Sequence, residues 1–346
     1  MIEIRKLASI QEVKSLEPID GADRIELANV LGWQCVVNKG QFHAGDLAVY
    51  FEIDSFLPVR EQFEFLRKSC YTKSDLLGEG FRLRTQKFKG VVSQGLLLPV
   101  GTFHEISAPI IGDDVTELLG VVKWQYEQRD TNDGRIIGLR PYCIPRTNET
   151  RIQVMPELLN EFESLEYYIS TKMDGSSHSI GIDQYTDTFY VSGHSYEYNS
   201  GSFFEFVLQH EYGMRARAFA ENEHLTSLVI QGEFCAPNIQ SNRLKLDTPE
   251  WYIFTVIENG RRASLHRMLT VCNALGLRNV PIEETGFDLP AKYPDVDAIL
   301  KRSEGDYPNG GKKEGIVVRP VEPAFSALIG DYLSFKAVNN QFLLKT

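Results

Sequence analysis

Cysteine is scarce in this chain, and its five copies follow no recognisable pattern. They stand at Cys35, Cys70, Cys143, Cys235 and Cys272, and no two of them form a Cys-x-x-Cys pair. An odd number of scattered cysteines is unlike a disulfide framework and unlike a cysteine-rich zinc site. The sequence therefore predicts an intracellular protein, cytoplasmic or, in a eukaryote, nuclear.

Long apolar runs are also missing. No stretch approaches the roughly 20 apolar residues that cross a bilayer, and the opening MIEIRKLASI lacks the apolar core of a signal peptide. No membrane role is expected. With 346 residues and an ordinary apolar content, the chain is long enough for two domains, each with its own core.

Positive charge is in deficit, since 36 Lys and Arg face 47 Asp and Glu, for a formal charge of −11. This argues against a non-specific nucleic-acid coat protein, because affinity for phosphate backbones comes mainly from Lys and Arg. Basic residues nevertheless gather in FRLRTQKFKG (81–90) and in GGKKEGIVVRP (310–320). Each stretch fits either a solvated strand face or the wall of a nucleic-acid groove.

The distribution of apolar residues separates two regions. Up to about residue 119, short runs rich in Val, Ile, Phe and Tyr alternate with turn residues, which predicts strands and a small closed β-barrel. A charged, poorly periodic stretch over 121–143 follows, and we place the domain boundary there. Beyond it, YYISTKMDG, SLVIQGEFC, WYIFTVIENG and EGIVVRP are predicted strands, whereas SFFEFVLQHEYGMRARAFAENE has helical spacing. This interleaving predicts an α+β fold with antiparallel sheets.

Several common catalytic motifs are absent. The nearest approach to a phosphate-binding P-loop, GDYPNGGKKEG, has Lys313 where Ser or Thr is required. No G-x-S-x-G, H-E-x-x-H or G-x-G-x-x-G occurs, and the seven histidines show no metal-ligand spacing. P-loop chemistry is not expected.

One set of residues stands out by its order. Lys172-Met173-Asp174-Gly175 is followed by Glu233 in QGEFCAPNIQ, Phe254 in WYIF, Glu314 in EGIVVRP and Lys336 in SFKAVNNQF. Taken alone, Asp-Gly between two strands is a common hairpin signal, and a lysine before it is usually solvated. The complete set, with acidic and aromatic members at strand ends, is difficult to obtain by accident.

This set resembles the signature of the covalent nucleotidyltransferases, which include polynucleotide ligases and mRNA capping enzymes. GEFCAPNIQ followed by WYIF is most similar to the ATP-dependent RNA ligases that seal nicked duplexes. The resemblance implies an OB-type barrel over residues 1–125 for nucleic-acid binding. It also implies an adenylyltransferase domain over 126–346, with antiparallel sheets flanked by helices. We expect the protein to be a monomer.

The same resemblance implies roles for individual residues. Lys172 would attack the α-phosphorus of ATP and hold AMP, and Lys336 would contact the α-phosphate. Glu314 would bind Mg or Mn, Glu233 would hydrogen-bond the ribose, and Phe254 would stack on adenine. The alternatives are a surface acid paired with a neighbouring lysine for Glu314 and a core aromatic for Phe254.

Other positions match the family less closely. Arg146 and Arg151, in PRTNETRIQ, stand where RNA ligases carry basic residues near the nucleotide phosphates, although solvated arginines at a helix N-terminus are an equal alternative. His194 stands where the family usually has an arginine, and Ser334 replaces the first lysine of a Lys-x-Lys pair. Because no further domain is expected after Lys336, pyrophosphate would be oriented by a second metal ion or by basic residues of the barrel.

The sequence therefore predicts an ATP-dependent RNA ligase that acts on a nicked or broken RNA-containing duplex. AMP would pass from ATP to Lys172, then to a 5′-phosphate, and would be displaced by the neighbouring 3′-OH. The 81–90 stretch would grip the duplex. A DNA ligase, a capping guanylyltransferase and a catalytically inactive nucleic-acid-binding protein are the alternatives.

Overall fold

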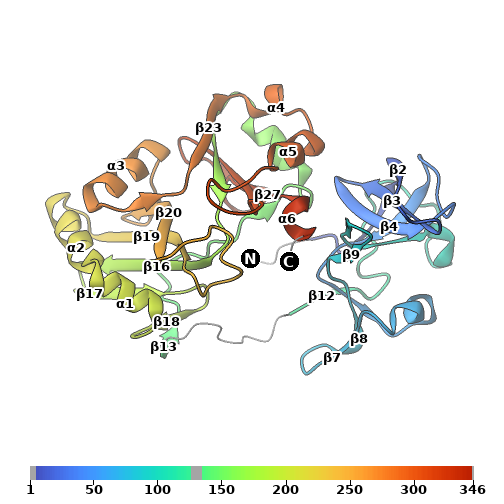
Figure 1. The fold of residues 1–346 in the computed structure, drawn as a ribbon, viewed down its shortest axis with the longest axis horizontal. Coiled ribbons are helices and arrows are strands. Elements are labelled where there is room, and N and C mark those ends of the chain that lie inside the picture. The colour runs from blue at the N-terminus through green and yellow to red at the C-terminus, as the bar shows by residue number, and fades with distance from the viewer. Residues whose placement is uncertain (1–4, 126–134, 345–346) are drawn as a thin grey trace. The chain divides into compact units, whose positions relative to one another are not determined.

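The computed structural model of the chain describes residues 5–125 and 135–344. These residues form two compact units, one ending before residue 130 and the other running to Phe342 (Figure 1). None of the helices in the described part of the chain is long and apolar enough to cross a membrane.

The first unit consists almost entirely of short antiparallel strands. A meander is formed by β2 (Ser15–Pro18), β3 (Ile25–Val30) and β4 (Trp33–Asn38), and a three-stranded sheet by β1 (Ala8–Glu12), β5 (Leu47–Phe51) and β11 (Leu96–Pro99). The other strands are β12 (Val122–Lys123), β6 (Ser55–Pro58), β8 (Gly78–Arg82) and β7 (Tyr71–Ser74), in that spatial order, and the pair β9 (Gln86–Phe88) and β10 (Val91–Ser93). Two 3-10 helices, η1 (Glu61–Leu66) and η2 (Val100–Thr102), complete the unit.

Turn chemistry and aromatic packing explain this unit. Strands β3 and β4 are joined by Leu31 and Gly32, whose φ angles of 50° and 72° are those of the two-residue turns that suit twisted hairpins. Phe51, Phe63 and Phe103 meet in the core with ring centroids 5.4 to 5.9 Å apart. The basic stretch 81–90 lies on two strands, since β8 ends at Arg82 and β9 begins after a short connection.

The second unit is built on two sheets. The larger has the order β13 (Ile136–Leu139), β18 (Tyr196–Tyr198), β17 (Thr188–Ser192), β16 (Ser176–Asp183), β19 (Ser227–Cys235), β20 (Glu250–Glu258) and β21 (Arg261–Arg262), with β22 (Arg278–Asn279) beside β20. The smaller has the order β14 (Thr150–Arg151), β27 (Phe335–Val338), β24 (Gly315–Pro320), β15 (Glu166–Lys172) and β23 (Ile282–Phe287). A separate pair is formed by β25 (Phe325–Ser326) and β26 (Asp331–Tyr332).

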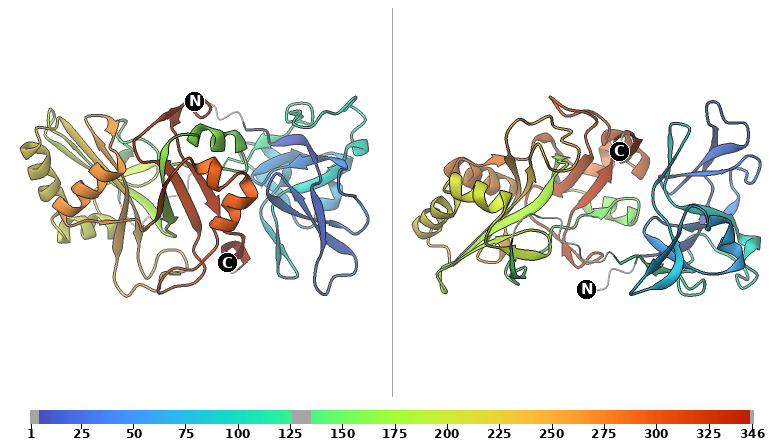
Figure 2. Two further views of the ribbon diagram at one scale, coloured as in Figure 1. Left: turned by 90° about the horizontal axis from the view of Figure 1, so that it is seen from above. Right: turned by 60° about the horizontal axis from the view of Figure 1, so that its bottom comes forward.

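Helices cover both sheets of this unit. Those on the larger sheet are α1 (Ser202–Gln209), α2 (Tyr212–Asn222) and α3 (Leu265–Leu275), and one apolar core joins them to the sheet (Figure 2). The smaller sheet shares its core with η3 (Pro156–Phe162), α4 (Leu289–Lys292) and α5 (Val296–Arg302), and the short α6 (Asn340–Leu344) follows β27. The expected α+β class is confirmed. The pairings are antiparallel except for the short contacts β14 with β27 and β20 with β22, which are parallel.

The segment from Lys172 to Gly175 joins the two sheets. Strand β15 pairs with β23 and β24 in the smaller sheet, whereas β16 pairs with β17 and β19 in the larger one. The hairpin alternative for Asp174-Gly175 is therefore wrong. Gly175 passes so close to β19 that a β-carbon there would stand 2.5 Å from the carbonyl oxygen of Phe234. The crossing leaves Lys172 at the edge where the two sheets face each other.

Candidate active site

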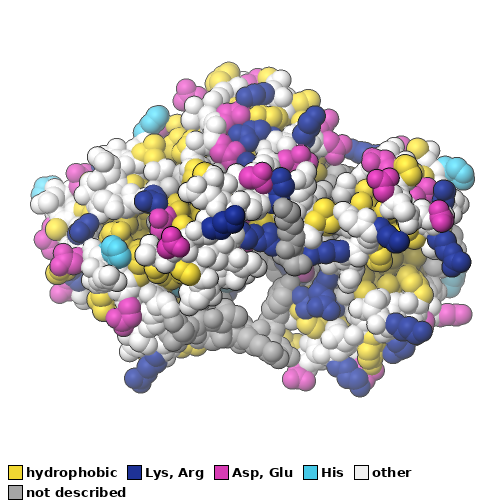
Figure 3. Space-filling view, in the orientation of Figure 1, with side chains coloured by type: hydrophobic (Ala, Val, Ile, Leu, Met, Phe, Trp, Pro, Cys, Tyr) yellow, Lys and Arg dark blue, Asp and Glu magenta, His cyan; other side chains and the backbone are white. Residues whose placement is uncertain are grey.

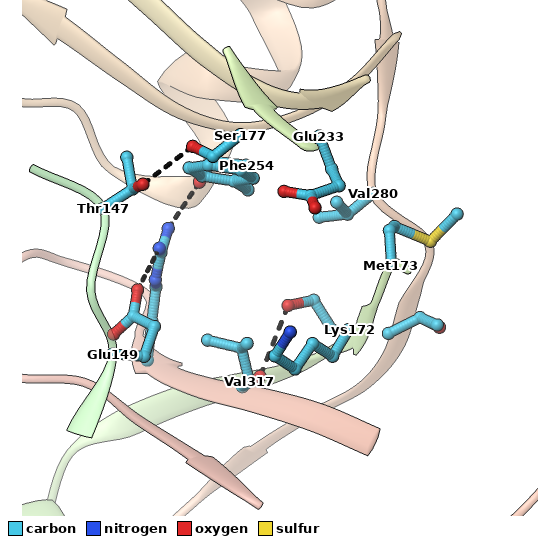
Figure 4. A pocket seen from close by; sticks show the side chains of 12 residues that line it. Thr147, Glu149, Lys172, Met173, Ser177, Glu233, Phe254, Val280 and Val317 are labelled. Carbon is cyan, nitrogen blue, oxygen red and sulfur yellow. Dashed lines mark hydrogen bonds and ion pairs between the residues drawn. The ribbon is translucent and has the colours of Figure 1, made fainter. Parts of the chain in front are cut away.

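A pocket of the second unit lies where β15 ends, and both sheets contribute to it (Figure 4). Its lining comprises Thr147, Glu149, Ser170, Thr171, Lys172, Met173, Ser177, Glu233, Phe254, Val280, Val317 and Arg319. Three of the sequence-predicted site residues, Lys172, Glu233 and Phe254, are among them. The side chains of Lys172 and Glu233 point into the same space from different sides.

Lys172 is held beside Glu314 by strand pairing. Lys172 ends β15 opposite Gly315 on β24, and its Nζ atom lies 2.6 Å from Glu314 Oε1. Tyr307 reinforces this arrangement, because its hydroxyl donates to the Lys172 carbonyl (2.7 Å) and accepts the Glu314 N–H (3.1 Å). The alternative pairings for Glu314 are wrong, because Lys312 pairs with Asp306 and Lys313 with Glu283.

Glu233 projects from β19 into the pocket. Burial raises its pKa to about 8. The negative charges of Glu314 and Asp174 act in the same direction, against the opposing effects of Lys172 and the Gly175 N–H. A carboxyl with this pKa keeps its proton at neutral pH and can both donate and accept a hydrogen bond.

Phe254 forms an apolar wall of the pocket from β20. Its ring and the side chain of Val317 lie on different sides of the opening (Figure 4), and Val280 extends the apolar lining. The Phe254 carbonyl accepts a hydrogen bond from Arg319, whose guanidinium carbon lies 5.7 Å from the Phe254 ring centroid. A slot walled by an aromatic ring suits a flat heteroaromatic group.

Lys336 and the predicted arginines form a basic region next to this pocket. Lys336 on β27 is the register partner of Arg151 on β14. Burial and the charges of Lys172 and Arg151 lower the pKa of Lys336 to about 8. Partial desolvation and the positive charges of Arg140, Arg146 and Lys336 lower the pKa of His194. Both His194 and Arg146 lie at the surface. The predicted site residues Lys336, Arg151, Arg146 and His194 are not among the residues that line the pocket, and neither is Glu314.

The sequence reasoning missed a buried ion pair in the pocket wall. Glu149 accepts hydrogen bonds from Arg319 and from the Ser334 hydroxyl. Burial acts to raise the pKa of Glu149, but Arg319, Arg262 and these hydrogen bonds outweigh it and lower the pKa to about 2. The two stretches that contain this pair, PRTNETRIQ and GGKKEGIVVRP, were both singled out in the sequence. The pairing itself joins residues 170 positions apart, which no local pattern reveals.

Comparisons with known proteins agree with this architecture. The chain matches a family profile described as RNA ligase over residues 165–338 and an OB-fold domain over residues 7–100. The second match confirms the expected OB-type fold of the first region. No curated protein sequence matches the chain.

Solved structures of Naegleria gruberi RNA ligase resemble the whole chain. The complex with PPi has 29% sequence identity and a TM-score of 0.73, covering 99% of each chain. A variant of that ligase with ATP and Mn has 29% sequence identity and a TM-score of 0.74. Another variant, with AMP and Mn, has 29% sequence identity and a TM-score of 0.73. Both matches cover 99% of each chain.

Proposed function

This chain belongs to the RNA ligase family, and we propose that it joins RNA 3′-OH and 5′-phosphate ends through an AMP carried by Lys172. The observation that supports this most directly is the position of Lys172. It is a strand-end lysine inside a pocket that also offers a carboxyl group and an aromatic wall. A lysine amine can attack phosphorus once it has lost its proton.

The first step would load the enzyme. The Lys172 nitrogen forms a bond to the α-phosphorus of ATP while the bond from that phosphorus to the bridging oxygen breaks, and pyrophosphate leaves. Negative charge on the α-phosphate oxygens must be offset in the transition state. We assign this role to Lys336, whose pKa is lowered to about 8 by burial and by the nearby positive charges of Lys172 and Arg151.

The nucleotide would be held by the remaining pocket residues. Phe254 offers a face for stacking on adenine, with Val317 across the opening. Glu233, protonated at neutral pH because its pKa is about 8, can donate to one ribose hydroxyl and accept from another. Arg146, Arg151 and His194 are proposed to meet phosphate groups in the adjoining basic region.

The acidic groups fit a hard divalent cation, Mg or Mn. The pKa of Asp174 is raised by burial and then by the charge of Glu314, so a cation would relieve unfavourable negative charge. Within residues 5–125 and 135–344, no cluster of three or more His, Cys, Asp or Glu is arranged as a complete metal site. Glu314 with water and nucleotide phosphates would suffice, because Mg usually binds few carboxylates. When bound, the ion would offset phosphate charge.

The later steps require RNA. AMP would pass from Lys172 to the 5′-phosphate of one strand, and the 3′-OH of the other would then displace it and form the phosphodiester. We assign part of the RNA grip to the first unit, where Arg84, Lys87 and Lys89 are exposed and Arg82 lies 4.6 Å over the Trp124 ring. Lys and Arg side chains gather over β8, β9 and β12 (Figure 3). Such side chains contact phosphate backbones.

Transfer of label from α-labelled ATP tests this proposal. The wild-type protein should acquire AMP in the presence of Mg or Mn, and should then seal nicked duplexes with an RNA 3′-OH strand. Adduct formation from GTP instead of ATP would indicate a capping enzyme, and equal sealing of DNA and RNA 3′-OH strands would remove the RNA preference. Absence of any adduct would favour an inactive binding protein.

A further inference from the structure

A partly buried carboxylate, Glu283, connects the residues that precede Lys172 and Glu314. Glu283 Oε1 accepts the Thr171 hydroxyl at 2.8 Å. Lys313 Nζ lies 2.8 and 2.7 Å from the two Glu283 oxygens. Glu283 therefore contacts both Thr171, which precedes Lys172, and Lys313, which precedes Glu314. Lys172 and Glu314 themselves form an ion pair.

A bulge in β23 produces this arrangement. Opposite β15, Glu284 pairs with Ile169 and Ile282 pairs with Ser170, so Glu283 is an extra residue in its strand. A β-bulge redirects the side chain of the extra residue relative to a regular strand. Here the Glu283 side chain meets Thr171 of β15 and Lys313, which directly precedes Glu314 at the start of β24.

The contacts of Glu283 are short and largely shielded from solvent. Only 5% of Lys313 is exposed, and Arg302 Nη1 completes the network at 2.7 Å from Glu283 Oε2. Burial acts to raise the pKa of Glu283, but hydrogen bonds from Lys313, Arg302 and Thr171 outweigh it and leave the pKa below its ordinary value. The carboxylate is therefore charged, and removing it would leave a buried ammonium without its partner.

We propose that Glu283 is a positioning residue for adenylyl transfer, which sets the Lys172 amine and the Glu314 carboxylate through Thr171 and Lys313. The assignment rests on the proposed function. Glu283 does not line the pocket, so it acts on the reaction only through these neighbours. Misplacement of a reacting group by about 1 Å can slow a reaction by about a hundredfold, so even a small rearrangement here has a measurable effect.

The adjacent residue provides a matched control. Glu284 is a similarly covered carboxylate, with 15% of its side chain exposed against 18% for Glu283. It accepts from Tyr167 (2.8 Å), Lys292 (2.7 Å) and Tyr293 (2.9 Å). None of these groups adjoins Lys172 or Glu314 in the sequence. Arg302 also donates to Glu284 (3.3 Å). Glu284→Gln therefore disturbs the same ion network without touching Thr171 or Lys313.

The test compares full-length Glu283→Gln and Glu284→Gln with the wild type. For each, the melting temperature and the single-turnover rate of AMP attachment to Lys172 are measured over a range of ATP concentrations. We expect both variants to melt at lower temperature. Only Glu283→Gln should slow the reaction at saturating ATP, by about tenfold or more, with a smaller change in the half-saturating ATP concentration.

Milder variants keep the test decisive if Glu283→Gln does not fold. Thr171→Val removes one hydrogen bond and should slow AMP attachment, whereas Thr171→Ser keeps the hydroxyl and should restore it. Wild-type rates in Glu283→Gln or Thr171→Val, or equal slowing by Glu284→Gln, would overturn the positioning role while the proposed function stands. A wild type that acquires no AMP would overturn both.

Discussion

Lys172 and Glu314 form an ion pair, with 2.6 Å between Nζ and Oε1, where β15 ends at Lys172 and its partner strand β24 begins directly after Glu314. In the proposed reaction each has a different partner, phosphorus for the amine and a divalent cation for the carboxylate. Binding of the cation would therefore withdraw Glu314 from the ion pair and leave the amine available.

This relationship predicts a specific defect in Glu314→Gln. The variant should need a higher Mn concentration than the wild type for half-maximal AMP attachment, because an amide is a weaker ligand for a hard cation than a carboxylate. A titration of the initial rate with Mn at saturating ATP measures this. An unchanged half-saturating concentration would mean that Glu314 does not hold the cation.

Phe254 should govern the affinity for the nucleotide. Replacement by leucine removes the aromatic face, and stacking of a base on an aromatic ring contributes about 1–3 kcal/mol. Phe254→Leu should therefore raise the dissociation constant of ATP by about tenfold, whereas Phe254→Tyr should bind nearly as the wild type does. Calorimetric titration measures both. Equal affinity of the leucine variant would place adenine elsewhere.

Glu233 should make stability depend on pH. Its pKa is about 8 in the folded protein against an ordinary 4.5, so the folded state binds the proton more tightly. The resulting stabilisation is complete below pH 4.5 and is lost as the pH rises through about 8, with a slope of up to about 1.4 kcal/mol per pH unit. Melting temperatures of Glu233→Gln should fall less between pH 5 and 8 than those of the wild type. Identical pH profiles would contradict the raised pKa.

Glu149 and Arg319 should be energetically coupled. Breaking a buried ion pair by removing one member costs about 3–5 kcal/mol, so Glu149→Gln and Arg319→Met should each lower the free energy of unfolding strongly. The double variant should lose less than the sum of the two. Denaturant unfolding of the four proteins gives the coupling energy, and additive losses would show that the pair does not act as a unit.

Local patterns in the sequence predicted the strands that carry the site. The predicted strands around Lys172, Glu233, Phe254 and Glu314 correspond to β15, β19, β20 and β24, because alternation and β-branched residues are properties of short segments. The order of motifs, by resemblance, then indicated the family. The roles assigned to the individual residues stay predictions.

Features that depend on distant segments were not accessible in this way. The hairpin alternative at Asp174-Gly175 failed because strand pairing is decided by the whole sheet rather than by two turn residues. The Glu149–Arg319 pair and the bulge at Glu283 arise from contacts across more than 100 residues. A single sequence contains no local signal for such contacts.

If Lys172 carries AMP, peptide mass spectrometry after incubation with ATP and Mg or Mn will locate the adduct. One adenylate should be found on Lys172 in the wild type and in the control Lys312→Ala, whose lysine pairs with Asp306 instead, and none in Lys172→Ala. Wild-type protein without the adduct, or with adenylate on another side chain, would contradict this role of Lys172.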